Sequence, residues 1–193
     1  MGQSQSFSIG DFPLQVQLEN FAWVESKFTY DLVQLYKITK ERKAISDYVI
    51  KLDNAEETFK SIGGGLFVDD KRTLLDSNDQ PICNLKGNSI YSGMESKKRL
   101  ATMIALKKSK LLFTLKFHSK EIPYKISEFH CQLNKGHTQA VIYVIHDKKC
   151  IPIANFLRLR MDQLDHITMT ISPGIDTSLL IMFCIAINEE LDR

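Results

Sequence analysis

The first residues of the chain contain the chemical signal for attachment of a fatty acid. Residues Met1–Ser6 read M-G-Q-S-Q-S, which matches the pattern M-G-x-x-x-[S/T] of N-myristoylation sites. In that reaction Met1 is removed and the free amine of Gly2 is acylated. The other interpretation is a polar terminus that fits the pattern by chance. One myristoyl chain gives only reversible membrane affinity, on the order of 10⁴ M⁻¹, so attachment requires a second signal.

A basic segment in the middle of the chain could supply that second signal. Between Lys97 and Lys125 the sequence has nine lysine and arginine residues and a single acid, Glu121. Each such cation near an anionic leaflet adds ~1 kcal/mol of attraction, which falls off within a Debye length. Alternatively, these lysines only mark solvent-facing surfaces and sheet edges. The candidate lipid-binding residues are Lys97, Lys98, Arg99, Lys107, Lys108 and Lys110.

Other chemistry finds little support in the sequence. A net charge of +2 and few aromatic residues among the lysines argue against nucleic acid. No G-x-S-x-G, G-x-x-x-x-G-K-[S/T] or H-E-x-x-H motif occurs. Cys131, His137, His146 and Cys150 include no C-x-x-C pair for zinc. The stretch Asp76–Pro81 begins like a calcium loop but ends on proline where that loop requires glycine. We therefore predict no metal, no cofactor and no catalytic residue.

Short alternating stretches separated by turn residues indicate a mainly β protein. Strands at spacings of about 8–12 residues are typical of a sandwich or barrel. The turn clusters Asp76–Pro81 and His146–Lys149 predict two hairpins. The segment 28–38 fits either a strand or a helix. The stretches expected to form strands include 14–18, 44–52, 111–117, 140–145, 151–159 and 167–171.

The C-terminal segment breaks this pattern and predicts a buried helix. Ser172–Gly174 ends the last expected strand, and Asp176, Thr177 or Ser178 can cap a helix. Leu179–Ile187 is apolar on every side, and such a helix must be enclosed. In a β domain the natural place is the interior of a barrel. This run is far shorter than the ~18–20 residues that span a bilayer, so we expect no transmembrane segment.

The size and composition of the chain fit a single cytoplasmic domain. Its 193 residues, 44% hydrophobic and 25% charged, suit one buried core. The N-terminus lacks the basic start and apolar run of a secretory signal. The cysteines are scattered, and reduced thiols are the simpler interpretation. They are Cys83, Cys131, Cys150 and Cys184.

The end of the chain resembles that of LURP-one-related proteins, a family of the tubby C-terminal superfamily to which the phospholipid scramblases also belong. The resemblance lies in the alternating strand, in Ser172–Asp176 and in the apolar helix with its acidic end. Lys110–Lys116 resembles the central strand of the family, and Leu74–Cys83 lies where the family has a similar turn. The likeness is clearest over residues 45–193. The family's usual glycine in that turn is absent from this chain.

The resemblance implies a closed antiparallel barrel of about twelve strands around a buried C-terminal hydrophobic helix. It also implies a non-enzymatic role, since tubby-like relatives bind phosphoinositides, scramblases act at membranes and plant relatives are linked to defence. We expect a flexible arm over residues 1–11, with the acylation signal, and one tubby C-terminal-like domain over residues 12–193.

Three functional hypotheses follow from these observations. The first is a peripheral protein at the inner face of a membrane, held by myristate on Gly2 and by a basic face that recognises anionic lipid or phosphoinositide. The second is a soluble protein–protein scaffold, in which the lysine face and residues 11–44 dock a protein partner. The third is an enzyme whose site forms only on folding.

Overall fold

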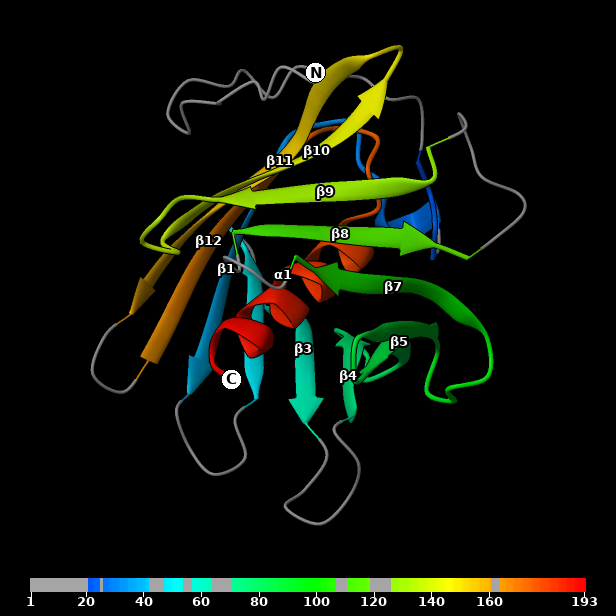
Figure 1. Ribbon diagram of the computed structural model, residues 1–193. Coiled ribbons are helices and arrows are strands. Elements are labelled where there is room, and N and C mark those ends of the chain that lie inside the picture. The colour runs from blue at the N-terminus through cyan, green and yellow to red at the C-terminus, as the bar shows by residue number, and fades with distance from the viewer. Residues whose placement is uncertain are drawn as a thin grey trace.

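The computed structural model of the protein is a barrel of antiparallel strands around one helix (Figure 1). It describes residues 21–24, 26–41, 47–53, 57–63, 71–106, 111–118, 126–160 and 164–193. The elements are a 3₁₀ helix (Ser26–Phe28), β1 (Gln34–Glu41), β2 (Tyr48–Leu52), β3 (Glu57–Gly63), β4 (Lys71–Asp76), β5 (Pro81–Lys86), β6 (Ser89–Ser92), β7 (Arg99–Ala105), β8 (Leu112–Phe117), β9 (Glu128–Leu133), β10 (Gln139–His146), β11 (Lys149–Arg160), β12 (Leu164–Ile171) and α1 (Thr177–Leu191).

Alternating side chains explain why these segments form a barrel. Along β12, Asp165, Ile167, Met169 and Ile171 are buried, while the residues between them are partly exposed. Each strand pairs with its neighbours in sequence, and β1 closes the ring by pairing with β12 from Gln34–Ile171 to Glu41–Leu164. Among the described strands, this closure leaves no unpaired sheet edge. The predicted mainly β fold, a closed barrel of twelve strands, is confirmed.

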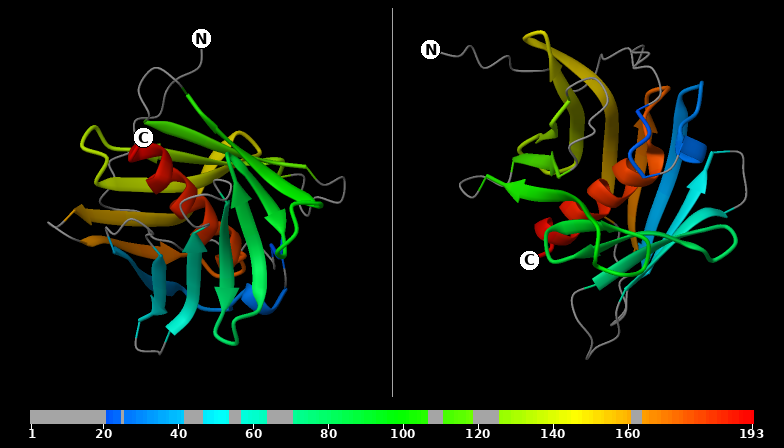
Figure 2. Two further views of the ribbon diagram at one scale, coloured as in Figure 1. Left: turned by 90° about the horizontal axis from the view of Figure 1, so that it is seen from below. Right: turned by 90° about the vertical axis from the view of Figure 1, so that its right-hand side faces the viewer.

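The helix α1 occupies the interior of the barrel, as its apolar surface predicts. Figure 2 shows it passing through the ring of strands. Every residue from Thr177 to Asn188 is buried, and Asp176 is the N-cap, accepting a hydrogen bond from the Leu179 N–H. The helix continues beyond the apolar run to Leu191. Across the described ranges, no helix combines the length and the apolar character needed to cross a bilayer.

Several strand predictions can be compared with the structure. The ambiguous stretch 28–38 divides into the end of the 3₁₀ helix and the start of β1. The strand expected over 44–52 begins at Tyr48 among the described residues. The predicted hairpin β4–β5 is present, and Asp79 in its turn has φ 60°. Aspartate tolerates this left-handed conformation, so the turn forms without the family's glycine. The strand expected over 14–18 lies outside the described residues.

The barrel end near the start of α1 is covered by the segment 21–24. Phe21 forms a parallel bridge with Ile175, and its N–H donates to the Gly174 carbonyl at 2.5 Å. The ring of Trp23 stacks on Phe21 and lies 4.4 Å, between centroids, from Phe117. This aromatic group closes one mouth of the barrel over the helix N-terminus.

The opposite mouth is closed by charged residues around Glu189, in the last turns of α1. Its carboxylate lies 3.0 Å from Lys40 Nζ and 3.3 Å from Arg72 Nη2, and it accepts a hydrogen bond from the Tyr48 hydroxyl at 2.7 Å. Burial acts to raise the pKa of Glu189, but Arg72, Tyr48 and Lys40 outweigh it and hold that pKa below its ordinary value. These contacts tie α1 to β1, β2 and β4.

Asp192 ties the end of α1 to the other side of the same mouth. Its carboxylate accepts hydrogen bonds from Arg158 at 2.7 Å, from Lys40 at 3.1 Å and from Arg160. Although burial opposes the effect, Arg158 and Lys40 lower the pKa of Asp192. The buried Arg158 also lies 3.6 Å from Asp165. The C-terminal end of α1 is thus anchored to strands on both sides of this barrel mouth.

Candidate functional site

Lys97, Lys98 and Arg99 lie where β6 passes into β7, and all three are exposed. Lys97 is paired with Glu95, the Nζ–Oε2 distance being 2.5 Å, and both side chains project into solvent, 83% and 71% exposed. Arg99 begins β7 opposite Tyr91 of β6. The β6–β7 loop and the first residue of β7 therefore present three of the predicted lipid-binding residues on the surface of the barrel.

Asn84 fixes this loop against the outer side of β5. Its neighbours Cys83 and Leu85 point into the core, so the Asn84 side chain faces outward, yet it is completely buried. The Asn84 amide donates to the Gly93 carbonyl at 2.8 Å and accepts from the Ser96 hydroxyl at 3.0 Å. The loop covers Asn84 and is held by both ends of its amide group.

Two further lysines that the sequence analysis did not select join this surface. Lys71 on β4 donates to the carbonyl of Met94 in the loop, and Lys71 pairs with Lys86 of β5 across the hairpin. We call Lys71, Lys86, Lys97, Lys98 and Arg99 the basic loop site. It contains five cations, with Glu95 as the acid in the same loop. No local spacing in the sequence could have indicated Lys71 and Lys86, because the β4–β5 register and the fold of the loop bring them there.

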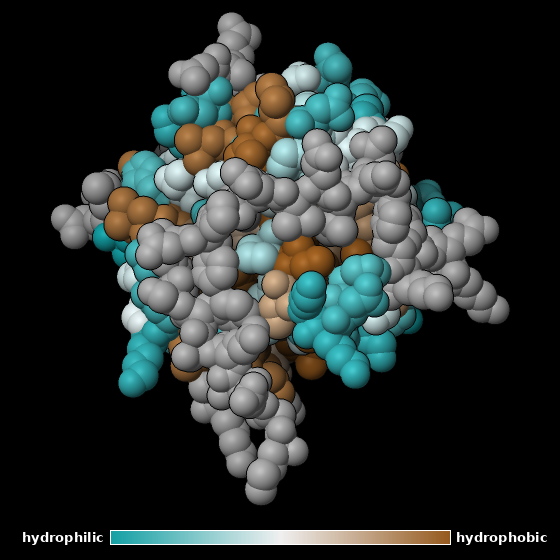
Figure 3. Space-filling view, turned by 90° about the horizontal axis from the view of Figure 1, so that it is seen from above, coloured by the Kyte–Doolittle hydropathy of each residue, from teal (hydrophilic) through white to brown (hydrophobic). Residues whose placement is uncertain are grey.

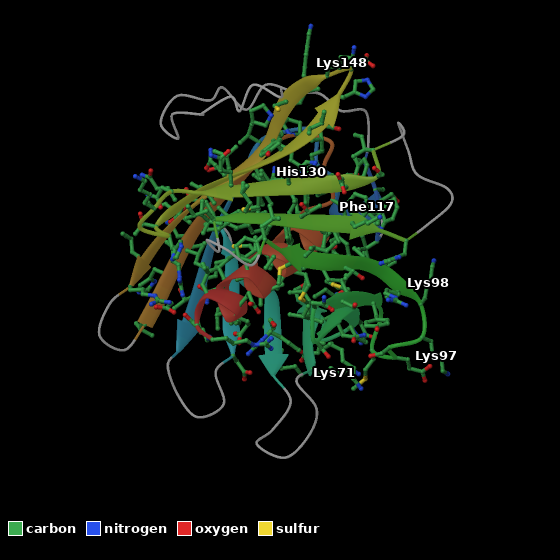
Figure 4. All side chains as sticks on the ribbon, viewed as in Figure 1. Lys71, Lys97, Lys98, Phe117, His130 and Lys148 are labelled. Atoms are coloured by element: carbon green, nitrogen blue, oxygen red, sulfur yellow. The ribbon has the colours of Figure 1, made fainter. Side chains whose placement is uncertain are left out.

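Figure 4 shows how far this surface lies from the other labelled lysine. Lys71, Lys97 and Lys98 gather at the lower right of the view, whereas Lys148 stands at the tip of the β10–β11 hairpin at the top. Figure 3, which shows the molecule from above, has small hydrophobic areas separated by hydrophilic ones among its coloured residues. The basic loop site is therefore a local surface feature distinct from that end of the molecule.

The remaining predicted site residues lie outside the described part of the chain. They are Gly2, Lys107, Lys108 and Lys110. The predicted basic residues divide into two groups along the chain, 97–99 up to the first residue of β7 and 107–110 after that strand. Arg99 begins β7 and Leu106 follows its end, a separation of about 23 Å for an extended strand. The structure brings Lys97, Lys98 and Arg99 together, and the other assignments stay predictions.

The residues considered for metal binding serve other purposes. Asp76 Oδ1 accepts hydrogen bonds from the backbone N–H groups of Asn78 and Gln80, both at 2.9 Å, so its carboxylate stabilises the turn. His137 lies in the turn before β10 and His146 is the last residue of that strand, so the two lie toward opposite ends of β10. Within the described ranges, no group of three or more His, Cys, Asp or Glu residues is arranged to hold a metal ion.

His130 has the most developed polar surroundings of the described histidines, and they are structural. Its ring stacks on Tyr143 with centroids 5.3 Å apart, and its Nδ1 lies 3.4 Å from the Thr114 hydroxyl. Burial lowers the pKa of His130, against the opposing effect of Glu128. These side chains form a ladder across the outer face of β8, β9 and β10, which fits cross-strand packing rather than a reaction centre.

One comparison with known proteins shows the family of this chain, and another shows its fold. The family model for LURP-one-related proteins matches residues 34–188. The X-ray structure of an Arabidopsis thaliana protein is similar with a TM-score of 0.66 and 20% identity, covering 90% of this chain and 100% of that one. At this identity the likeness shows the fold alone. A search of curated protein sequences found no match. Because the family model spans most of the barrel, from the first residue of β1 into the last turns of α1, the chain belongs to the LURP-one-related family.

Proposed function

We propose that this protein is a non-enzymatic binding module attached reversibly to the cytoplasmic face of a membrane by myristate on Gly2 and by a basic surface that recognises anionic lipid. The observation that supports it is the basic loop site, where Lys97, Lys98 and Arg99 on a loop fixed by Asn84 lie beside Lys71 and Lys86 of the β4–β5 hairpin. The loop also carries the exposed apolar side chain of Met94. A fixed cationic loop with an exposed apolar side chain suits an anionic headgroup layer.

Myristate and the basic loop site together should bind an anionic membrane more tightly than either one alone. A myristoyl chain alone binds with ~10⁴ M⁻¹. If three cations of the basic loop site each add ~1 kcal/mol, affinity rises by about 100-fold or more. The ionic part must weaken as salt screens it. Neutral vesicles should therefore retain only the affinity of the acyl chain.

A protein–protein scaffold is the second candidate function. It is favoured by the exposed apolar pair Leu32 and Val33, which lie immediately before β1 and are 74% and 48% exposed. They belong to the N-terminal part of the chain, residues 11–44, that the scaffold hypothesis assigns to a partner. Such a protein would bind its partner without lipid and would not respond to vesicle charge.

Co-sedimentation with vesicles tests the proposal. The acylated protein is compared with Gly2→Ala and with Lys97→Gln/Lys98→Gln, on phosphatidylcholine vesicles with and without phosphatidylserine or phosphoinositide. Lys148→Gln/Lys149→Gln is the matched control, because it removes the same charge from the exposed β10–β11 hairpin. We expect Gly2→Ala to lose most binding and Lys97→Gln/Lys98→Gln to lose about 30-fold on anionic vesicles.

The possible outcomes separate the candidate functions. Binding that falls on Gly2→Ala and becomes less salt-sensitive on Lys97→Gln/Lys98→Gln supports two-signal attachment. Equal losses from the Lys148→Gln/Lys149→Gln control would mean that only net charge matters and that the basic loop site has no special role. Absence of binding to every vesicle by the acylated protein would overturn the lipid proposal and leave the scaffold.

A further inference from the structure

Three large apolar side chains lie exposed together where β7 and β8 meet at one end of the sheet. Ile104, Leu106 and Leu112 are 48%, 55% and 36% exposed. Leu106 donates its backbone N–H to the Leu112 carbonyl at 3.0 Å, so these two residues face each other across the hairpin. Ile104 precedes Leu106 by two positions and therefore shares its face.

The core does not require these three residues to be apolar. On the same strands Met103, Phe113 and Leu115 point inward and are buried. On the outer face Thr114 lies opposite Ile104, and the polar residues Thr102 and Lys116 follow further along the hairpin. The apolar group is therefore confined to the hairpin end. A contiguous exposed group of this kind indicates an interaction site more strongly than scattered apolar residues do.

The charges around this group favour an anionic lipid surface as its partner. In sequence, Leu106 and Leu112 enclose K-K-S-K-L, and no acid occurs between Ser96 and Lys120. The β9–β10 turn lies at the same end of the sheet, because Leu112 pairs with Gln132 near the end of β9. That turn adds Lys135 and no acid. Exposed apolar residues next to turns whose sequences carry lysine and no acid complement anionic headgroups over acyl chains, whereas protein interfaces commonly pair charges of both signs.

We infer that Ile104, Leu106 and Leu112, which we call the hairpin tip, enter the headgroup region of an anionic membrane and set the orientation of the barrel. This inference rests on the proposed function and adds the element that inserts. The hairpin tip lies about 23 Å along β7 from the basic loop site, so a flat bilayer along the outer side of β7 can reach both. The strand β7 thus runs along the membrane with an insertion point at one end and a cationic loop at the other.

The double variant Leu106→Ser/Leu112→Ser tests the inference on phosphatidylcholine vesicles containing phosphatidylserine. Removing two half-exposed leucines from the lipid interface should lower partitioning about 30-fold. The control is Leu157→Ser/Leu159→Ser on the outer face of β11, whose side chains are 38% and 49% exposed. Its partitioning should equal that of the unmodified protein, and urea midpoints of both variants should match it.

A second measurement reports the position of the tip directly. Leu106→Trp and Leu159→Trp are bound to vesicles that contain brominated phosphatidylcholine, and tryptophan quenching is measured above the background of Trp23. We expect strong added quenching for Leu106→Trp and little for Leu159→Trp. This measurement stands even if the serine variant folds poorly.

The outcomes distinguish the inference from the proposed function. Suppose that the unmodified protein binds anionic vesicles, but that Leu106→Ser/Leu112→Ser binds equally well or Leu106→Trp is not quenched. Insertion of the hairpin tip is then overturned, whereas the proposal of lipid binding stands. If the β11 control loses as much binding, insertion at this tip is overturned as well. If the unmodified acylated protein binds no vesicle, both proposals are overturned together.

Discussion

Val24 donates its backbone N–H to Asp176 Oδ2 at 2.6 Å, across 152 positions of the sequence. The same oxygen accepts from the Trp23 N–H at 3.0 Å, while Oδ1 accepts from Ser178 and Leu179. One buried carboxylate therefore caps the central helix and also holds the segment that precedes the family domain. The start of α1 and the segment 21–24, which covers the barrel mouth there, therefore depend on a single side chain.

Replacing Asp176 by alanine should cost about 3 kcal/mol of unfolding free energy. The change removes a helix N-cap, worth ~1 kcal/mol, and leaves the Trp23 and Val24 N–H groups without their acceptor, at ~1–3 kcal/mol per buried group. The urea midpoint measures the loss. Asp176→Asn should be the milder variant, since it keeps one acceptor oxygen. A loss below 1 kcal/mol in Asp176→Ala would show that this link is dispensable.

The carboxylate of Glu189 should make the protein less stable in acid. Burial opposes ionisation, but Arg72, Tyr48 and Lys40 lower its pKa below the ordinary value. The folded state then binds fewer protons than the unfolded state, so stability is present above the ordinary glutamate pKa and is lost as pH falls through the lowered one. Glu189→Gln should cost about 1–2 kcal/mol at pH 7, and this difference should shrink toward pH 3 in urea titrations.

The exposed Glu95 provides the control for that experiment. Glu95→Gln removes a carboxylate whose partner Lys97 is largely in solvent, and such pairs contribute little to stability. Its stability should follow the unmodified protein at each pH. A Glu189→Gln difference that stays constant from pH 7 to pH 3 would contradict the role of ionised Glu189 at the barrel mouth.

Asn84→Ala should loosen the basic loop site without opening the barrel. The variant loses the hydrogen bonds to Gly93 and from Ser96, and about 1–2 kcal/mol is expected from a buried amide removed with its partners. Amide exchange should quicken at Ser92 and Gly93, whose N–H groups bond to Lys98 and Ile82. Asn78→Ala, in the exposed β4–β5 turn, is the control. Unchanged exchange in Asn84→Ala would show that the loop is held in another way.

The sequence was sufficient for features set by local pattern and insufficient for those set by strand register. The apolar run 179–187 could only be enclosed, and Asp176 was among the three predicted caps, so the buried helix and its start were predictable. The bond from Asp176 to Val24 was not, because no spacing rule connects positions so far apart. Lys71 and Lys86 were missed for the same reason, since only the β4–β5 pairing places them beside the loop.

The cysteines test whether the barrel interior is closed in solution. All four thiols are free, and Cys83, Cys131 and Cys184 are fully buried whereas Cys150 on β11 is partly exposed. Burial raises the pKa of Cys184 to about 12 and raises those of Cys83 and Cys131 as well. Since the thiolate is the reactive form, these three thiols are protected in two ways: burial keeps the reagent away, and the raised pKa keeps them protonated.

An aromatic disulfide reagent at pH 8 should therefore modify one thiol quickly in the native protein. Cys150→Ser should remove that fast phase and leave thiols that react only as the chain unfolds, with a rate that rises with urea. The charged mouth at Glu189 and the aromatic mouth at Trp23 both have to stay shut for this result. A second fast thiol in Cys150→Ser would show that one of these mouths opens in the native state, and combining that variant with Asp176→Ala or Glu189→Gln would identify which one.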